Sequence, residues 1–295
     1  MSATILGEVR DMPAEQYHAI EALSASGMRE LSRSAWHFKN RRQITPTKAM
    51  LSGTLVHCAQ LEPEALAARY VVVPADAPRR PVKAQRMAKN PSPDSIAAMN
   101  WWDNFAAQCG SRLIISAEDF ELCRAQLAAI QAEPELRELF ASGYGETSVF
   151  WIDSRTGVYC KARPDWVSPV DARTVDIVDL KSTANESPNL FSRTVANMGY
   201  HRQQEHYIKG FEQATGKKVR RFIFAAVTGS QPCLAVPYEL DDIAAKVGRD
   251  ECAELAALYA RCRESGHWPA YGEGVQLIGL PQWAMPSTEL EFSNV

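Results

Sequence analysis

Three polar residues in the middle of the chain have the types and spacing of a hydrolytic site. Asp165 occurs in CKARPDW, and Asp179 and Lys181 follow in VDIVDLKSTA. Alternation along a strand points Asp179 and Lys181 to the same side. Two carboxylates with a nearby oxygen or nitrogen ligand suit a hard cation such as Mg²⁺ or Mn²⁺. Since a metal lowers the pKa of a bound water and an ammonium can orient that water or stabilise charge at phosphorus, the set could hydrolyse a phosphodiester.

The same residues allow a plainer interpretation. An acid, a spacer and a lysine at the end of a strand also form a surface ion pair, and such triplets occur by chance in many chains. Asp176 lies in the same stretch, but strand parity points it away from the side shared by Asp179 and Lys181. We therefore expect Asp176 to lie off the site.

Two further motifs carry residues that could join this site. Gly53 and His57 occur in GTLVH, where the glycine would let a neighbouring backbone come close to the helix. Gln203 and Tyr207 occur in HRQQEHYIKGF, and their i, i+4 spacing places them on one helix face. Taken alone, each motif is unspecific and fits ordinary packing.

The elements that position these residues follow from periodicity and turn signals. We expect helices over residues 22–42 (capped by Ser24 or Ser26, then a basic stretch), 47–61, 94–108, 117–141, about 189–214 and about 240–264. We expect strands over residues 147–153, 158–167 and 175–181, as a three-stranded meander, and over 220–228 and 234–240. The hairpin from the second to the third strand would bring Asp165 and Asp179 to one end of the sheet.

This order predicts an α/β fold in which helices flank a mixed central sheet. We expect one domain over 1–295, with a helical part over about 1–140, a catalytic sheet core over about 145–240, and a C-terminal helix and tail over about 240–295. The irregular tail from His267 is expected to pack over the body.

Composition limits the possible partners and compartment. The 295 residues are 46% hydrophobic and 23% charged with a net charge of −3, so local basic patches would have to hold any nucleic acid. The seven cysteines form no C-x-x-C pair, which excludes the usual zinc and iron–sulfur spacings and favours reduced thiols in the cytoplasm. Neither a signal peptide nor a membrane span is expected.

Four motifs, taken in their order along the chain, resemble the nuclease signature of the RecB and RecE families within the PD-(D/E)xK superfamily. They are G-x-x-x-H, R-P-D, D-L-K and Q-x-x-x-Y. Two further segments resemble the opening segments of the C-terminal nuclease domain of RecE, exodeoxyribonuclease VIII, and its phage-encoded relatives. These segments are YHAIEALSASGMRELSRSAWHFK and SGTLVHCAQLEPEALAARYVVVP. The resemblance covers about residues 17–240. Lambda exonuclease is a more distant relative, with an acid where this chain has His57.

The resemblance implies a restriction-endonuclease-like core and a role for each motif residue. Lys181 would be the catalytic lysine, and Gln203 and Tyr207 would support the catalytic residues Asp165 and Asp179 and contact DNA near the scissile phosphate. The metal ligands would be the side chains of His57, Asp165 and Asp179 and the backbone carbonyl of Leu180. The cofactor would be Mg²⁺, with Mn²⁺ as a substitute and two ions per site.

The resemblance also implies an exonuclease that digests linear double-stranded DNA from an end, 5′ to 3′, and leaves 3′ overhangs. Such enzymes form trimeric or tetrameric rings and act beside a single-strand annealing protein, in bacteria or encoded by phages. Two alternatives stay open: a structure-specific endonuclease on the same fold, and a non-catalytic DNA-end-binding recombination scaffold. A scaffold is disfavoured because a decayed site should have lost an acid or the lysine.

Several basic groups could bind the DNA backbone, whose neutralisation dominates duplex affinity. Ser26 and Arg29 could bind a 5′-phosphate through a helix N-terminus, and Arg163 could touch a phosphate or offset nearby negative charge. The densest run comprises Arg79, Arg80, Lys83, Arg86 and Lys89, in what we predict to be a loop over 75–95, and its alternative is a solvated loop. Two weaker candidates are Lys39, Arg41 and Arg42, and the strand-edge charges Lys217, Lys218, Arg220 and Arg221.

Overall fold

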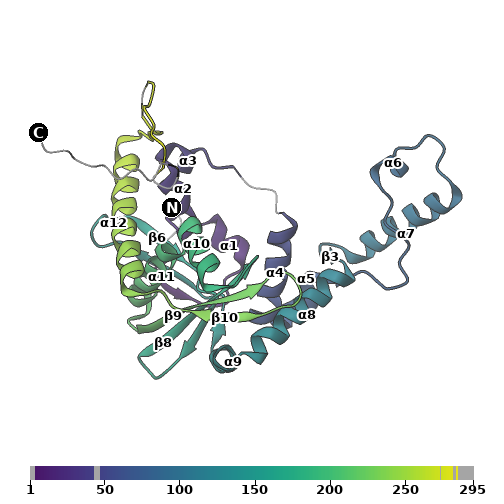
Figure 1. Ribbon diagram of the computed structural model, residues 1–295, viewed down its shortest axis with the longest axis horizontal. Helices are drawn as coiled ribbons and strands as arrows, with labels where there is room; N and C mark the ends of the chain where they lie inside the picture. The colour runs from purple at the N-terminus through teal and green to yellow at the C-terminus, as the bar shows by residue number, and fades with distance from the viewer. Residues whose placement is uncertain (1–3, 43–46, 273, 282–283, 285–295) are drawn as a thin grey trace, which may run out of the picture.

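A five-stranded mixed sheet forms the centre of the molecule (Figure 1). The computed structural model describes residues 4–42, 47–272, 274–281 and 284. The strand order is β10 (Ala235–Tyr238), β9 (Lys218–Thr228), β8 (Thr174–Thr183), β7 (Trp166–Pro169) and β4 (Tyr144–Gly145). Strands β8 and β9 are parallel and the other neighbours are antiparallel. The predicted mixed sheet with flanking helices is therefore confirmed.

The predicted meander is divided between two sheets. Strand β5 (Ser148–Ile152) pairs with β6 (Tyr159–Ala162) and with β1 (Gly7–Val9) in a separate three-stranded sheet, whereas β7 pairs with β8. The expected strand over 158–167 is interrupted between β6 and β7, where Pro164 lacks the N–H that a continuous ladder needs. This interruption places Asp165 immediately before β7.

Helices cover both faces of the central sheet (Figure 1). They are α1 (Ala14–Ala19), α2 (Ala25–Arg33), α3 (Ala35–Lys39), α4 (Lys48–Leu61), η1 (Pro63–Ala65), α5 (Leu66–Arg69), α6 (Lys83–Arg86), α7 (Pro93–Cys109), α8 (Ala117–Ala132), α9 (Pro134–Ala141), α10 (Pro188–Met198), α11 (Tyr200–Thr215) and α12 (Asp242–Ser265). Ser24 caps α2, because its Oγ accepts a hydrogen bond from the Gly27 N–H at 3.2 Å.

Three predicted helices are each divided in two. The helix expected within 22–42 ends at Ser34, the helix expected over 117–141 is interrupted before Pro134, and the helix expected over 189–214 is interrupted at Gly199. Gly199 has φ +70°, which L side chains rarely adopt and which turns the chain between α10 and α11. Short strands β1, β2 (Tyr70–Val72) and β3 (Leu113–Ile115) also occur in the part expected to be helical.

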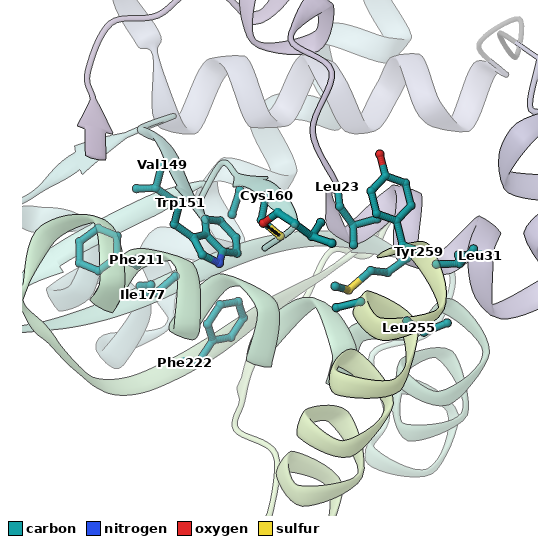
Figure 2. Packing of buried hydrophobic residues seen from close by; sticks show 14 of the residues in the cluster. Leu23, Leu31, Val149, Trp151, Cys160, Ile177, Phe211, Phe222, Leu255 and Tyr259 are labelled. Atoms are coloured by element: carbon teal, nitrogen blue, oxygen red, sulfur yellow. Dashed lines mark hydrogen bonds between the residues drawn. The ribbon is translucent and has the colours of Figure 1, made fainter. Parts of the chain in front are cut away.

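Strand β8 is buried on both faces. Val175 and Ile177 face a cluster that includes Trp151, Phe211 and Phe222 and is covered by α11 and α12 (Figure 2). Val178 and Leu180 face a second cluster, made with α4, α8 and α9. Because alternate residues share a face, Asp179 and Lys181 lie on the side of Val175 and Ile177, and that side holds α11.

Two segments leave the body. Residues 73–112, between the parallel strands β2 and β3, form a projection in which α7 runs along the axis and α6 lies near the far end (Figure 1). At the other end, Trp268 stacks on Phe38 with ring centroids 5.5 Å apart, so the tail packs on α3 as predicted. Val275 and Leu277 are fully exposed, and packing of the tail stops before them. Among the described residues, no helix is long and apolar enough to cross a membrane.

Candidate active site

The interruption between β6 and β7 aims Asp165 at strand β8. Trp166, the first residue of β7, pairs with Val178, so β8 continues past the start of its neighbour. The Asp165 carboxylate takes the place of a backbone acceptor there, because its Oδ2 accepts a hydrogen bond from the Leu180 N–H at 2.8 Å. The predicted approach of Asp165 to the Asp179–Lys181 segment is therefore seen, although β8 runs on to Thr183 and does not end at this segment.

Asp179 is fully buried, with one carboxylate oxygen hydrogen-bonded and the other, Oδ2, in an ion pair but without a hydrogen-bond donor among the described residues. Lys181 Nζ lies 2.5 Å from Oδ2, and Gln203 Nε2 donates a hydrogen bond to Oδ1 at 2.8 Å. Tyr207 lines the same cleft as Gln203, one turn further along α11, so both motif residues lie on one face of this helix. The Lys181 ammonium also lies 4.5 Å from the centroid of the Tyr200 ring.

His57 lies beside Asp165 on α4. Its Nδ1 is 3.6 Å from Asp165 Oδ2, and its ring is hydrogen-bonded to the Leu180 backbone. Burial and the Lys181 ammonium lower the pKa of His57 to about 4, so the imidazole is neutral at physiological pH, which is the form that binds metals. Gly53 is not needed for a close backbone approach, because a Cβ there would meet only the Ser182 side chain at 3.8 Å.

Glu146 is a site residue that the sequence analysis missed. One carboxylate oxygen of Glu146, one of Asp165 and a ring nitrogen of His57 lie within 4.8 Å of one another. Glu146 has φ +52°, its N–H donates to the Asp165 carbonyl at 2.9 Å, and Arg163 Nε donates to its Oε2 at 2.5 Å. The only sequence signal was an acid directly before the β-rich run TSVFWID. Tyr200 was also missed, because the expected helix ran through Gly199.

The site brings buried acidic side chains close to one another. Burial and the Asp179 charge raise the pKa of Asp165 well above its ordinary value, and burial raises the pKa of Asp179 even against the Lys181 ammonium. Burial alone would lower the pKa of Lys181, but the carboxylates of Asp179 and Asp165 raise it. A divalent cation would relieve this repulsion, and carboxylate oxygens with a neutral imidazole fit Mg²⁺ or Mn²⁺. Asp179 lies outside the group formed by His57, Glu146 and Asp165, so its role as a ligand stays a prediction.

A cleft of about 990 Å³ extends from these residues to α2 and α3. It is lined by Ser26, Arg29, Arg41, Arg42, Glu146, Arg163, Asp165, Lys181, Gln203 and Tyr207, among others. Ser26 and Arg29 thus share a cleft with the acids. Arg163 is already bound, since besides Glu146 it donates to the Met12 carbonyl at 2.8 Å and to Ser148 Oγ at 3.1 Å. Its first role is to hold Glu146 in place.

The remaining basic candidates lie outside the cleft. Arg79, Arg80, Lys83 and Arg86 belong to the projection at 73–112. Asp176 faces away from the site, as expected, and binds both Arg220 and Arg221, with Nη2–Oδ2 distances of 2.5 and 2.9 Å. Lys218 pairs with Glu212 at 2.9 Å. Because Arg220, Arg221 and Lys218 already have acidic partners, the basic candidate at the strand edge is an ion-paired surface.

Comparison with solved structures supports the fold. The crystal structure of a "putative exonuclease" from Eubacterium rectale is 13% identical, the match covers 88% of each chain, and the TM-score is 0.52. SSO0001 is 14% identical over 70% of this chain and 86% of its own, with a TM-score of 0.27. An alkaline exonuclease (LHK-Exo) from Laribacter hongkongensis is 16% identical over 69% of this chain and 97% of its own, with a TM-score of 0.24. The last two scores are too low to bear on the fold.

No curated protein matches the sequence. Residues 24–281 match a family model described as a PDDEXK-like domain of unknown function (DUF3799), which spans most of the chain and includes every motif residue discussed above. The PD-(D/E)xK resemblance drawn from the four ordered motifs is therefore confirmed, and the chain belongs to this PDDEXK-like family.

Proposed function

We propose that this protein is a metal-dependent exodeoxyribonuclease that digests linear double-stranded DNA 5′ to 3′ from an end and leaves 3′ single-stranded overhangs. The observation that carries the proposal is the meeting of His57, Glu146, Asp165, Asp179 and Lys181, of which Glu146, Asp165 and Lys181 line a large cleft. Membership of a PDDEXK-like family supports phosphodiester hydrolysis. Polarity, end dependence and a role in recombination by strand annealing rest on the resemblance to the RecE nuclease domain.

The proposed chemistry needs a cation, and Mg²⁺ or Mn²⁺ would be held by His57, Glu146 and Asp165, with Asp179 and the Leu180 carbonyl as further candidates. When bound, the ion lowers the pKa of a coordinated water and stabilises charge on the phosphate. Asp179, fixed by Gln203, holds the Lys181 ammonium in place, and that ammonium donates hydrogen bonds to the attacking water or to a phosphate oxygen. The water oxygen bonds to phosphorus and loses a proton to solvent as the scissile P–O bond breaks, and the departing sugar oxygen takes up a proton from solvent.

The cleft also offers a place for the end of a strand. Ser26 and Arg29 of α2 line it together with the acids, so a terminal phosphate could be bound there while the scissile bond lies at the metal-binding residues. A ring of three or four copies, a single-strand annealing partner and a cytoplasmic location in a bacterium or a phage-infected cell complete the proposal, again from the resemblance.

Digestion of linear duplex labelled at either the 5′ or the 3′ end, with and without a 5′-phosphate, tests activity, polarity and end recognition together. We expect Mg²⁺-dependent release of the 5′ label first and no attack on closed circular duplex. Cutting of the circle would replace the proposal with an endonuclease. Tight binding of ends without turnover in Mg²⁺ or Mn²⁺ would replace it with a non-catalytic scaffold.

A further inference from the structure

The projection at residues 73–112, here called the arm, is attached to the body only at its base. Its ends are the parallel strands β2 and β3, which pair Tyr70 with Leu113 and Val72 with Ile115. Helix α7 has 17 residues, so the arm extends roughly 25 Å at 1.5 Å per residue. Figure 1 shows α7 and α6 standing clear of the central sheet and of the helices that cover it.

The arm is an ordered element with a small core of its own. Trp102 is 6% exposed, and its Nε1 donates to the Pro78 carbonyl at 2.9 Å, which ties the outgoing chain to α7. Trp101 stacks on Phe105 with ring centroids 5.0 Å apart, and Arg86 pairs with Asp103 at 3.0 Å to tie α6 to α7. These contacts hold the far end in a defined position before any partner binds, which lowers the entropic cost of binding.

The far end of the arm is strongly basic. Residues 77–93 contain Arg79, Arg80, Lys83, Arg86 and Lys89 and no acid, in a chain whose net charge is −3. Arg80 lies over the Trp102 ring and Arg86 binds Asp103, so these two cations have partners within the arm. Arg79, Lys83 and Lys89 are exposed and form no ion pair with any other described residue. Three free cations on a stiff support fit a polyanion, and not an apolar groove.

We propose that the arm is a second contact to the substrate, which binds the backbone of duplex DNA away from the cleft. This inference rests on the proposed function for the identity of the polyanion. The base of the arm follows α4, the helix that carries His57, and Arg69 at that base binds Glu62 at 2.6 and 2.8 Å. The arm therefore starts beside the site and reaches outward, so a duplex must extend beyond the cleft to meet it.

The length of the arm and the salt dependence of DNA binding give the expected size of the effect. At a rise of about 3.4 Å per base pair, the roughly 25 Å reach of α7 corresponds to about 7 base pairs outside the cleft. Each phosphate contact adds about −0.9 to the slope of log affinity against log salt, so three contacts add about −2.7. Between 50 and 200 mM salt, the wild-type affinity for long duplex should therefore fall roughly 40-fold more than the affinity of a variant without these contacts.

The test compares the triple variant Arg79→Gln/Lys83→Gln/Lys89→Gln with the wild type by fluorescence anisotropy on a duplex of about 40 base pairs, in EDTA to prevent cleavage. The matched control removes three exposed charges that, like those of the arm, form no ion pair with other described residues, as Arg173→Gln/Arg193→Gln/Arg261→Gln. We expect the shallower salt slope only in the arm variant. Single-turnover digestion of the same duplex in Mg²⁺, with protein at saturating concentration, should be the same in all three proteins, because none of the replaced residues lines the cleft.

Failure of the arm contact and failure of the proposed nuclease function would give different experimental results. An arm variant with the wild-type slope, in a protein that digests DNA, overturns the arm contact and leaves the nuclease standing. A slope difference in a protein that never cleaves DNA overturns the nuclease and leaves the contact. Val82 and Met87 on the same arm are 53% and 72% exposed, and apolar side chains of this kind could instead contact a second copy of the chain. Light scattering therefore measures the mass of the protein, which gives the number of subunits. A change in subunit number with unchanged DNA affinity would assign the arm to a second copy of the chain and refute our inference.

Discussion

Replacing Lys181 by methionine removes the cation that faces the buried Asp179 carboxylate. Asp179 is 0% exposed, and the Lys181 side chain is 15% exposed and lies 2.5 Å away. Removing one partner of a buried ion pair costs about 3–5 kcal/mol, because the other charge is left uncompensated. The hydrogen bond from Gln203 to Asp179 remains in the variant. We therefore expect the lower end of this range, a loss of about 3 kcal/mol in the free energy of unfolding at pH 8.

The loss should depend on pH in a defined direction. Burial already raises the pKa of Asp179 above its ordinary value, and losing the ammonium raises it further, as it does for Asp165. An acid whose pKa is higher in the folded protein stabilises the fold when protonated, and this contribution is lost as pH rises through the folded pKa. The unfolded chain titrates at about 3.9, so the deficit of Lys181→Met should be small near pH 4 and should grow as the pH rises to 8.

Urea unfolding followed by tryptophan fluorescence, at several values between pH 4 and pH 8 in EDTA, measures this deficit. Single-turnover digestion in Mg²⁺ measures activity, which should fall at least about 100-fold if the ammonium stabilises charge in the transition state. Asp176→Asn is the matched control for activity, because it breaks an equally buried ion pair on the same strand but away from the site, so it should lose stability and keep its digestion rate. A Lys181→Met protein with the wild-type urea midpoint at pH 8, or the wild-type digestion rate, would refute the reasoning.

Two further predictions concern the neighbouring donors. Glu146→Gln should raise the Mg²⁺ concentration for half-maximal digestion at least about 10-fold, with a parallel loss of Mn²⁺ affinity by calorimetry, and unchanged Mn²⁺ binding would exclude Glu146 as a ligand. The pKa of His57 is about 4 in the fold and about 6.5 unfolded, so the unfolded chain protonates first and stability falls as pH drops between these values. In His57→Gln, the free energy of unfolding, measured with urea in EDTA, should fall by about 3 kcal/mol less over this pH range. His206, whose pKa is also about 4, is present in both proteins and contributes equally to both. An identical pH dependence in both proteins would contradict the shift.

The parts of the site that could be predicted are those close together in the chain or linked by a motif. Asp165, Asp179 and Lys181 belong to one hairpin, whose length alone suggests that their side chains meet, and Gln203 follows from helix periodicity together with the ordered signature. The mixed sheet followed from the sequence of strand and helix patterns. These inferences need only local geometry.

What could not be predicted depends on how separate units pack. Glu146 reaches His57 only because it lies where the chain passes from β4 of the central sheet to β5 of the other sheet, and because it has a positive φ there. Tyr200 reaches Lys181 only because Gly199 turns the chain within a stretch whose periodicity reads as one continuous helix. Within the arm, helix α7 was predicted over 94–108, but residues 75–95 were predicted to be a loop, since the tertiary contacts of Trp102 that order this part leave no periodic signal.

The candidate metal-binding residues lie far apart along the chain, and this distance sets the order in which they can meet during folding. Asp165 and Asp179 belong to adjacent strands of a hairpin, which closes a short loop, whereas His57 comes from α4 and pairs with an acid more than a hundred residues away. Closing the longer loop costs more entropy and requires the helices to dock. We expect partly folded chains to bind no metal at this site, so a nascent or damaged copy would be harmless to the DNA around it.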